Sequence, residues 1–493
     1  FVYEQFDDVR LVAAPPSSIG KFGGDTDNWI WPRHTGDFSM FRVYASKDNR
    51  PAAYSPQNVP YRPKKHFSIS TKGVKEGDFT MIYGFPGNTQ EYILSDAVAY
   101  IAERSDPAKI AVRTGRLDII TKAQESDPAL RIHYAAKHAS IANAWKKWQG
   151  EALGIDRRGT VAAKFDYETQ FGLWSVGRPE YAGVVMGLRA EYDRIMDAYF
   201  AYEITRETLS TLPAAYTPEE RAEECFARRK FAEQALWRHA FREYGRCPKV
   251  YRTPSYAEGM ARYKSPEAYA DALFEAVWEG SDSVTMQPAV RLREETKRML
   301  DHISWMLGTK SLRNLNSKIL NELYTTYIKG LREWDRERAF YPDANLTLRV
   351  AYGSVAGYEY ADGEYHKPQT TLDGIIAKDN PEIYDYDIPQ SLRDLYASKN
   401  YGRWGTVIDG RRTVPVCFLA TNHTTGGNSG SPVLNAGGEL IGINFDRTWR
   451  STMSDIAYDP AICRNIAVDI RYVLFVVDRV GGAGYLLKEM TLK

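Results

Sequence analysis

A serine flanked by glycines is the part of this sequence best suited to chemistry. Ser429 lies in the segment 426–432, which has Gly426, Gly427 and Gly430 around it. Glycine adopts backbone conformations that residues with a Cβ resist, so the segment can form a tight turn that presents the Ser429 hydroxyl. The same turn can direct the N–H groups of Gly427 and Ser429 to one point, where they would stabilise an oxyanion. We therefore expect Ser429 to be a nucleophile and these two N–H groups to form its oxyanion hole.

The residues that follow this loop favour a catalytic role over a plain structural one. A glycine-rich serine segment by itself often marks only a surface turn. Here the apolar segment 432–435 is followed by the turn residues 436–438 and by the apolar segment 439–445. Strand, tight turn and strand is the order expected after the nucleophile of a chymotrypsin-like β-barrel. A short motif supports a catalytic role only when its structural context also agrees. The pattern therefore predicts a trypsin-like serine peptidase.

A serine nucleophile needs a base, usually histidine, and an acidic residue that orients the base. Asp37 is the candidate acid, because it directly precedes the segment 38–44, in which large apolar residues alternate as in a strand with one buried face. In trypsin-like peptidases the acid stands at the mouth of such a strand. Asp25 and Asp27 are rivals, but neither begins a strand pattern. We therefore expect Asp37 to be the acid.

The catalytic histidine is harder to assign. The sequence has eight histidines, at positions 34, 66, 133, 138, 239, 302, 366 and 423. In this class of peptidase the order is His, Asp, Ser, and only 36 residues precede Asp37. His34 is too close to Asp37 to bridge to a serine of the other barrel, and His423 shares the loop of Ser429. We therefore expect the base to lie in a segment that this chain lacks.

Composition excludes several other classes. Of the 493 residues, 43% are hydrophobic and 26% charged, as in an ordinary globular protein, and the net charge of +1 indicates neither a nucleic-acid nor an anionic-membrane partner. No apolar run approaches the ~18–20 residues of a membrane span. The cysteines form no C-x-x-C pair, and His133 and His138 lack the i, i+4 spacing of a helical metal pair. We expect no metal and no other cofactor.

The elements that must position these residues change in character along the chain. Strand patterns occupy 9–13, 38–44 and 77–85, and return at 347–352 and 414–420. From about 93 to 340 the pattern is helical, with an N-cap followed by proline at Asp127, Thr217 and Ser265. The segment 470–480 is expected to be a further helix.

One β domain interrupted by an inserted helical domain is the economical interpretation of this order. We expect a mixed β and α protein with a chymotrypsin-like double β-barrel peptidase domain at 1–92 and 345–493, whose first barrel is incomplete. A large all-α insertion at 93–344 is expected to cap the cleft of the peptidase domain.

The chain resembles the bacterial dipeptidyl peptidases, found in Bacteroidetes and related Gram-negative bacteria, that combine a chymotrypsin-like fold with a large helical insertion. The matching segments are 23–37, 425–432 and 468–475. The resemblance implies Ser429 as nucleophile, Asp37 as acid and a catalytic His in an N-terminal segment. It also implies a homodimer that is periplasmic, at the cell surface or secreted.

The resemblance assigns recognition of the free amino terminus of a peptide substrate to Asn28, Trp29, Asn143 and Asp446. A dipeptidyl peptidase must measure two residues from a charged ammonium, and carboxylate and amide oxygens are suitable acceptors for it. Asp446 ends the strand after the nucleophile loop. Asn143 shares a face of its helix with Ala136 and Ala139, where another surface can approach closely.

Arg447, which lies 18 residues after Ser429, is the residue on which substrate preference depends. In the resembling family, arginine here marks the Asp/Glu-specific branch and glycine the branch that prefers apolar residues. A guanidinium can hold a carboxylate through two parallel hydrogen bonds, and an unpaired buried charge would disfavour an apolar side chain. The alternative is a strand-end arginine that points to solvent.

We therefore expect a serine dipeptidyl peptidase that cleaves after Asp or Glu at the second position. Three alternatives stay open: the same activity with apolar preference, a trypsin-like endopeptidase with an open cleft, and a peptide-binding relic without activity. Replacing Arg447 by glycine should move the preference from acidic to apolar residues.

Overall fold

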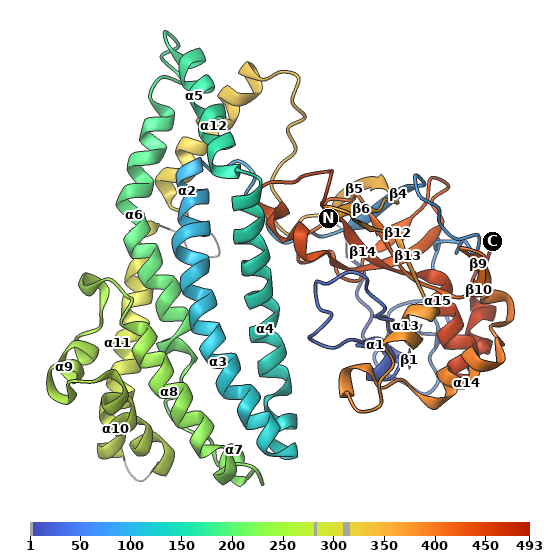
Figure 1. The fold of residues 1–493 in the computed structure, drawn as a ribbon, viewed down its shortest axis with the longest axis horizontal. Helices are drawn as coiled ribbons and strands as arrows, with labels where there is room; N and C mark the ends of the chain where they lie inside the picture. Colours follow the sequence, from blue (N-terminus) through green and yellow to red (C-terminus); the bar gives the residue numbers. More distant parts are fainter. Residues whose placement is uncertain (1–2, 281–282, 309–315) are drawn as a thin grey trace. The chain divides into compact units, whose positions relative to one another are not determined.

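The computed structural model describes residues 3–280, 283–308 and 316–493, and the chain divides into two compact units. One unit joins Phe1–Glu91 to Asp343–Lys493, and the other is Tyr92–Pro342. The first consists mainly of strands and short helices, whereas the second is helical (Figure 1). Each unit has its own hydrophobic core.

A seven-stranded antiparallel sheet, in the order β5-β4-β12-β13-β14-β11-β8, is the framework of the β unit. A three-stranded sheet, β1-β2-β3, and the pairs β9–β10 and β6–β7 complete its strands. The bounds are β1 Val9–Ala13, β2 Met40–Ala45, β3 Val59–Pro60, β4 Phe79–Gly84, β5 Arg349–Ser354, β6 Tyr358–Ala361, β7 Glu364–His366, β8 Gln369–Thr371, β9 Thr406–Ile408, β10 Arg411–Thr413, β11 Pro415–Ala420, β12 Pro432–Leu434, β13 Leu440–Arg447 and β14 Asn465–Asp469.

Burial along these strands follows from their composition. Every residue of β11 and of β14 is buried, and the two strands are neighbours inside the sheet. β11 is an apolar run, whereas β14 has its apolar residues between Asn465 and Asp469. In β4 the buried residues are Thr80, Ile82 and Gly84, at the alternate positions expected of a strand with one buried face. The strands predicted at 9–13, 77–85, 347–352 and 414–420 are confirmed to within a few residues.

Short helices surround this sheet and contribute to the same core. They are α1 Ser17–Gly20, α13 Leu372–Lys378, η5 Tyr384–Tyr386, α14 Gln390–Ser398, η6 Gly402–Trp404, η7 Trp449–Asp455, α15 Ile470–Phe475, η8 Val476–Val480 and η9 Gly484–Glu489. The helix predicted at 470–480 is present, but only its first part is an α-helix, because η8 continues it as a π-helical turn. Asp469 caps it by accepting a hydrogen bond from the Arg471 N–H.

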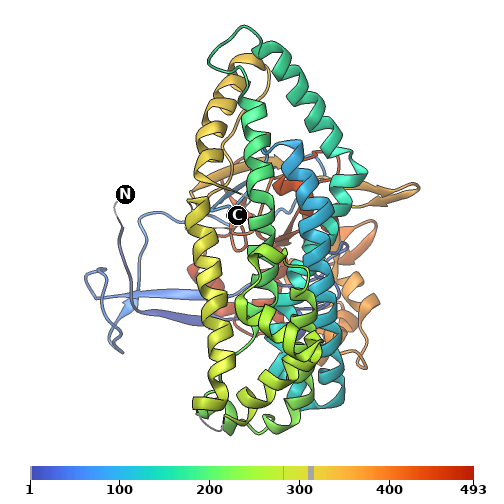
Figure 2. The same cartoon turned by 90° about the vertical axis from the view of Figure 1, so that its left-hand side faces the viewer.

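The helical unit contains long helices that run alongside one another (Figures 1 and 2). Its elements are α2 Ser95–Tyr100, η1 Ile101–Ser105, α3 Asp106–Ser126, α4 Pro128–Arg157, α5 Thr160–Ser175, α6 Val184–Glu207, η2 Leu209–Thr211, α7 Pro218–Ala222, η3 Ala227–Arg229, α8 Lys230–Tyr244, η4 Lys249–Tyr251, α9 Pro254–Tyr263, α10 Pro266–Glu279, α11 Ser283–Leu307 and α12 Lys318–Trp334. No helix in the described ranges is long and apolar enough to cross a membrane.

The predicted helix starts are confirmed by their caps. Asp127 accepts from the Ala129 N–H at the start of α4, and Ser265 accepts from the Ala268 N–H at the start of α10. Thr217 forms a capping box with Glu220 at α7. Each of these helices has proline in its first turn, where its missing N–H removes no hydrogen bond. Local sequence therefore determines where these helices begin.

Candidate active site

The loop that carries Ser429 connects β11 to β12, and its glycines are required by its geometry. Gly427 and Gly430 have φ values of 106° and 82°, in the region that favours glycine. A Cβ on Gly427 would also collide with the carbonyl oxygen of Phe85. The side-chain oxygen of Asn428 accepts a hydrogen bond from the Thr425 N–H, at 3.1 Å, which fixes the turn from inside. The loop is therefore closely constrained by backbone packing.

Ser429 itself is exposed at the tip of this turn. Its Oγ donates a hydrogen bond to the carbonyl oxygen of Phe445 in β13, at 3.2 Å. Within the described part of the chain, neither the Gly427 nor the Ser429 N–H has a hydrogen-bond acceptor. An exposed hydroxyl beside two unused backbone donors is the arrangement that an acyl-transfer nucleophile requires.

Asp446, the next residue of β13, forms the centre of a charged cluster. Its Oδ2 accepts from Nη1 of Arg33 at 2.7 Å and faces the backbone N–H of Trp29 at 3.4 Å. The side chains of Arg33 and Asp446 are about nine-tenths buried. This ion pair links the segment before β2 to the end of β13, and the sequence alone carried no sign of it.

Asp37 lies near the same cluster, as its electrostatics indicate. The residue is exposed, yet partial burial of its carboxyl raises the pKa above the ordinary value, and the negative charge of Asp446 raises that pKa further. The positive charge of Arg33 acts in the opposite direction. The charge of Asp446 therefore acts on the Asp37 carboxyl, while Ser429 hydrogen-bonds to Phe445, the residue that precedes Asp446.

The candidate residues for binding an amino terminus fall into two groups. Asn28 and Trp29 lie in the turn before β2, and Trp29 has a φ of 66°, which is rare for a residue with a side chain. Asp27 anchors this turn by accepting from Lys378 at 2.7 Å and from Tyr386 at 2.9 Å. Asn143 belongs to the other unit, where it is exposed on α4, and its part in the site stays a prediction.

Arg447 does not point to solvent, so that alternative for it is wrong. Only 4% of the residue is exposed. Its Nη1 and Nη2 donate to the two carboxylate oxygens of Asp455 at 2.6 and 2.8 Å, and Nη1 also contacts the Thr424 carbonyl and the Ser454 hydroxyl. The guanidinium is therefore paired, unlike the unpaired charge considered from the sequence. Nothing in the sequence indicates that Asp455 is the partner of Arg447.

The histidines of the β unit have other partners. Burial lowers the pKa of His34 to about 3, and its ring packs against Gly374 of α13. His423 Nε2 lies 2.9 Å from the Ser454 carbonyl oxygen. His66 and His366 lie within 2.9 Å of Thr491 and Glu364 side chains, respectively. Among the described residues, no imidazole forms a hydrogen bond with Ser429 or Asp37.

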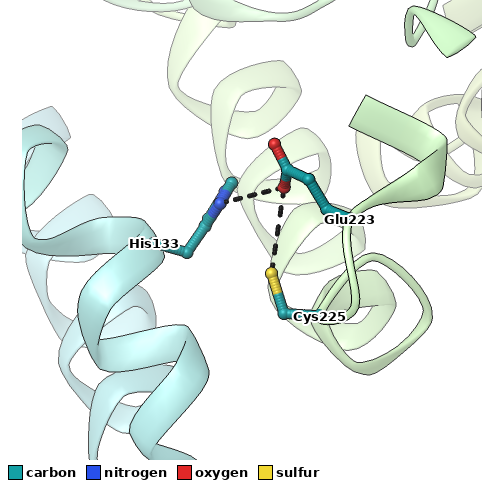
Figure 3. Close-up of side chains that lie close together, drawn as sticks. All are labelled: His133, Glu223 and Cys225. Atoms are coloured by element: carbon teal, nitrogen blue, oxygen red, sulfur yellow. Dashed lines mark hydrogen bonds and ion pairs between the residues drawn. The ribbon is translucent and has the colours of Figure 1, made fainter. Parts of the chain in front are cut away.

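The other four histidines belong to the helical unit, and one of them lies in a cluster of potential metal ligands. Figure 3 shows His133 and Cys225 both facing the same carboxylate oxygen of Glu223. The possible ligand atoms of the three residues lie within 4.8 Å of one another. The buried guanidinium of Arg229 contacts both His133, at 2.7 Å, and Glu223, at 3.1 Å. A metal ion would meet this positive charge at close range, so the geometry fits an ion-paired structural cluster better than a metal centre.

Comparison with known proteins places these features in a family context. The sequence profile of the family described as Peptidase S46 matches residues 1–229 and 219–492. The chain is 43% identical over 538 aligned residues to an Asp/Glu-specific dipeptidyl-peptidase of Capnocytophaga gingivalis, covering all of this chain and 74% of that protein.

Solved structures agree with this relationship. The chain matches the crystal structure of DPP11 from Porphyromonas endodontalis with a TM-score of 0.85 and 35% identity, over 99% of this chain and 76% of that one. The same protein in complex with the dipeptide Arg-Glu matches with a TM-score of 0.83 and 35% identity, over 99% and 75% of the two chains.

Proposed function

The chain belongs to the peptidase S46 family, and we propose that it is a serine-type dipeptidyl peptidase that prefers Asp or Glu as the second residue of its substrate. It would release dipeptides from the free amino termini of oligopeptides. The C. gingivalis relative is an Asp/Glu-specific dipeptidyl-peptidase, and one of the matching structures is a complex with the dipeptide Arg-Glu.

The observation that carries this proposal is the end of β13, where three consecutive residues serve three needs of such an enzyme. The carbonyl oxygen of Phe445 accepts a hydrogen bond from the Ser429 hydroxyl, and Asp446 offers a largely buried carboxylate. Arg447 offers a buried guanidinium. The acceptor for the substrate ammonium and the cation for its acidic side chain are thus adjacent residues of β13, and the nucleophile is hydrogen-bonded to the residue before them.

The reaction follows from these groups. Ser429 Oγ attacks the carbonyl carbon of the second substrate residue and gives its proton to an imidazole base, while the N–H groups of Gly427 and Ser429 stabilise the oxyanion. Collapse of the intermediate breaks the peptide C–N bond, and the leaving amine takes the proton. Water then hydrolyses the acyl-enzyme and releases the dipeptide. Asp37 would orient the base and stabilise its protonated form.

We propose that the base is a histidine outside these 493 residues. Each histidine of the β unit packs against or contacts other groups, and neither Ser429 nor Asp37 has an imidazole partner in the described residues. The C. gingivalis relative is longer, since the chain covers 74% of it, which leaves room for such a residue.

Recognition of the amino terminus would rest on Asp446, with Asn28, Trp29 and Asn143 as further contacts. Asp446 is already paired with Arg33, so its charge is partly compensated before a substrate arrives. An ammonium would add a second cation and would bind through charge-assisted hydrogen bonds, which are the stronger kind. Fixing the ammonium near Ser429 would restrict cleavage to the bond after the second residue.

The finer architecture belongs to the same proposal. We propose that the β unit is the interrupted chymotrypsin-like peptidase domain, with the three-stranded sheet as part of an incomplete first barrel, and that the helical unit is an inserted cap. A homodimer and a periplasmic, surface or secreted location are proposed from the family resemblance alone.

Paired substrates test the function directly. The full-length protein is given a fluorogenic peptide with Glu at the second position and a free amine, and the same peptide with its amine acetylated. We expect cleavage of the first and at least ~100-fold slower cleavage of the second, because the blocked amine carries no charge for Asp446. Equal rates would instead support an endopeptidase, and no cleavage of either would support a relic.

A further inference from the structure

We infer that the substrate preference of this chain is set by the ion pair Arg447–Asp455 and not by Arg447 alone. In this view, which rests on the function proposed above, Asp455 is a positioning residue. Its carboxylate holds the Arg447 guanidinium in position before the substrate binds. If Arg447 were replaced, the negative charge of Asp455 would remain in the pocket.

The geometry of the pair is that of a fixed fork. Nη1 and Nη2 of Arg447 each donate to a different oxygen of Asp455, at 2.6 and 2.8 Å, so the two planar groups align. Nη1 is held further by the Thr424 carbonyl oxygen at 3.1 Å and the Ser454 hydroxyl at 2.9 Å. Such a guanidinium has little freedom to rotate, and its position is determined before a ligand binds.

Asp455 is itself held in place by the surrounding backbone. It ends η7, and its carbonyl oxygen accepts a hydrogen bond from the Gln90 N–H at 2.6 Å. The side chains of Arg447 and Asp455 are only 5% and 12% exposed. Water can therefore screen neither charge well, and each is stabilised largely by the other.

The location of the pair connects it with the catalytic loop. Thr424, whose carbonyl oxygen accepts from Arg447, lies five residues before Ser429 and directly precedes the constrained turn. On the other side, the Trp29 ring lies 5.6 Å from the guanidinium carbon. Arg447 thus lies between the loop of the nucleophile and the turn that carries the candidate contacts for the amino terminus.

This pairing changes the electrostatic environment that the pocket presents to acidic and to apolar side chains of a substrate. An acidic side chain meets a guanidinium that is already neutralised, so Asp455 repels it while the guanidinium attracts it. An apolar side chain meets a neutral pair, which disfavours it less than a lone buried charge would. Asp455 therefore reduces the contrast between acidic and apolar substrates while keeping Arg447 in position.

Replacing Arg447 alone would leave the negative charge of Asp455 in the pocket. The variant Arg447→Gly removes the guanidinium that pairs with the buried Asp455 carboxylate. Removing one partner of a buried ion pair is destabilising, because the charge of the other partner stays buried and is no longer compensated by it. A substrate with Lys at the second position could supply the missing cation. The single variant should therefore favour Lys, and the apolar preference expected from the sequence should need removal of both charges.

The experiment compares four forms of the full-length protein on three substrates. Wild type, Arg447→Gly, Asp455→Asn and the double variant are assayed with free-amine dipeptidyl fluorogenic substrates that differ only in having Glu, Leu or Lys second. We expect Arg447→Gly to cleave the Lys substrate at least ~10-fold better than the Leu substrate in kcat/KM, and the double variant to prefer Leu. Asp455→Asn should raise the Glu-to-Leu ratio at least ~3-fold over wild type, mainly through KM.

Asp469→Asn is the matched control. It removes the carboxylate of another buried bidentate pair in the same unit, in which Arg471 donates to Asp469 at 3.0 and 2.7 Å. This variant should lower the melting temperature while leaving the ratios among the three substrates unchanged. A general loss of packing is thereby separated from a change in pocket charge.

Two results would overturn the inference: equal Lys-to-Leu ratios in Arg447→Gly and the double variant, or an unchanged Glu-to-Leu ratio in Asp455→Asn. If Arg447→Gly does not fold, Asp455→Asn and the double variant, whose pocket is neutral, decide the question. Wild type that fails to cleave the Glu substrate would refute the proposed function itself, whereas the outcomes above refute only the role of Asp455.

Discussion

At the scale of single residues, the most informative finding is that the candidate groups work in charged pairs. Asp446 is tied to Arg33 and Arg447 to Asp455, so neither is an isolated charge that awaits a ligand. Sequence reasoning found Asp446 and Arg447 but neither partner. Arg33 lies 413 positions from Asp446, and no periodicity or spacing connects two residues so far apart.

The pair Arg33–Asp446 yields a prediction about pH dependence. Asp446→Asn removes a negative charge that raises the pKa of Asp37 and leaves the positive charge of Arg33, which lowers it. The same change lowers the pKa of an imidazole held by Asp37. Groups that must be deprotonated for activity will then lose their protons at lower pH, so we expect the acid limb of kcat/KM to move down by roughly 0.5–1 pH unit.

The same variant should raise KM for a free-amine substrate at least ~10-fold, because the ammonium loses a charged acceptor. The measurement is a pH series of kcat/KM on the full-length protein. Asp25→Asn is the control, since Asp25 pairs with Lys21 at 3.2 Å near the same turn. An acid limb that stays in place or moves to higher pH in Asp446→Asn would contradict the proposed cluster.

At the scale of elements, the sequence predicts the regular strands and helix starts correctly, but it does not predict the irregular turns. Alternating apolar residues at 38–44 predicted β2, and caps followed by proline predicted the starts of α4, α7 and α10. The π-helical turn η8 was missed because nothing in its residues distinguishes a π-helical turn from the end of an α-helix. The turn at Asn28 and Trp29 was not foreseen either, since its anchors to Asp27 come from the distant residues Lys378 and Tyr386.

The helical unit contains a buried carboxyl whose titration tests its packing. Asp106, the first residue of α3, is fully buried beside Lys109, and burial raises its pKa from 3.8 to about 7. A raised folded pKa means that the folded state favours the protonated form. The corresponding stability is complete at pH values below the unfolded pKa of 3.8 and is lost as the pH rises through about 7.

Asp106→Asn, which stays neutral, should remove this dependence. Relative to the variant, we expect the wild-type free energy of unfolding to fall by on the order of 1–3 kcal/mol between about pH 4 and pH 8. Denaturant unfolding at several pH values measures it, and Asp118→Asn in α3 provides a control at an exposed position. A difference that does not change with pH would show that Asp106 is charged throughout, as a partner of Lys109.

At the scale of the whole molecule, the β unit is assembled from both ends of the chain. The match to the peptidase S46 family extends over nearly the whole chain. The order of strand and helix patterns in the sequence favours, as an expectation, one β domain with a helical insertion. It could not predict which side chains meet at the end of β13, because that depends on tertiary packing among the turn before β2, the nucleophile loop and η7.

The measurement that tests the central claim most directly is covalent labelling of the full-length protein. A dipeptidyl phosphonate with a free amine and Glu as its second residue mimics the substrate and reacts with an activated serine. We predict a single adduct, located by peptide mass spectrometry on Ser429, that forms at least ~100-fold more slowly in Asp37→Asn. An adduct on another residue, or unchanged labelling of Ser429 in Asp37→Asn, would contradict the account.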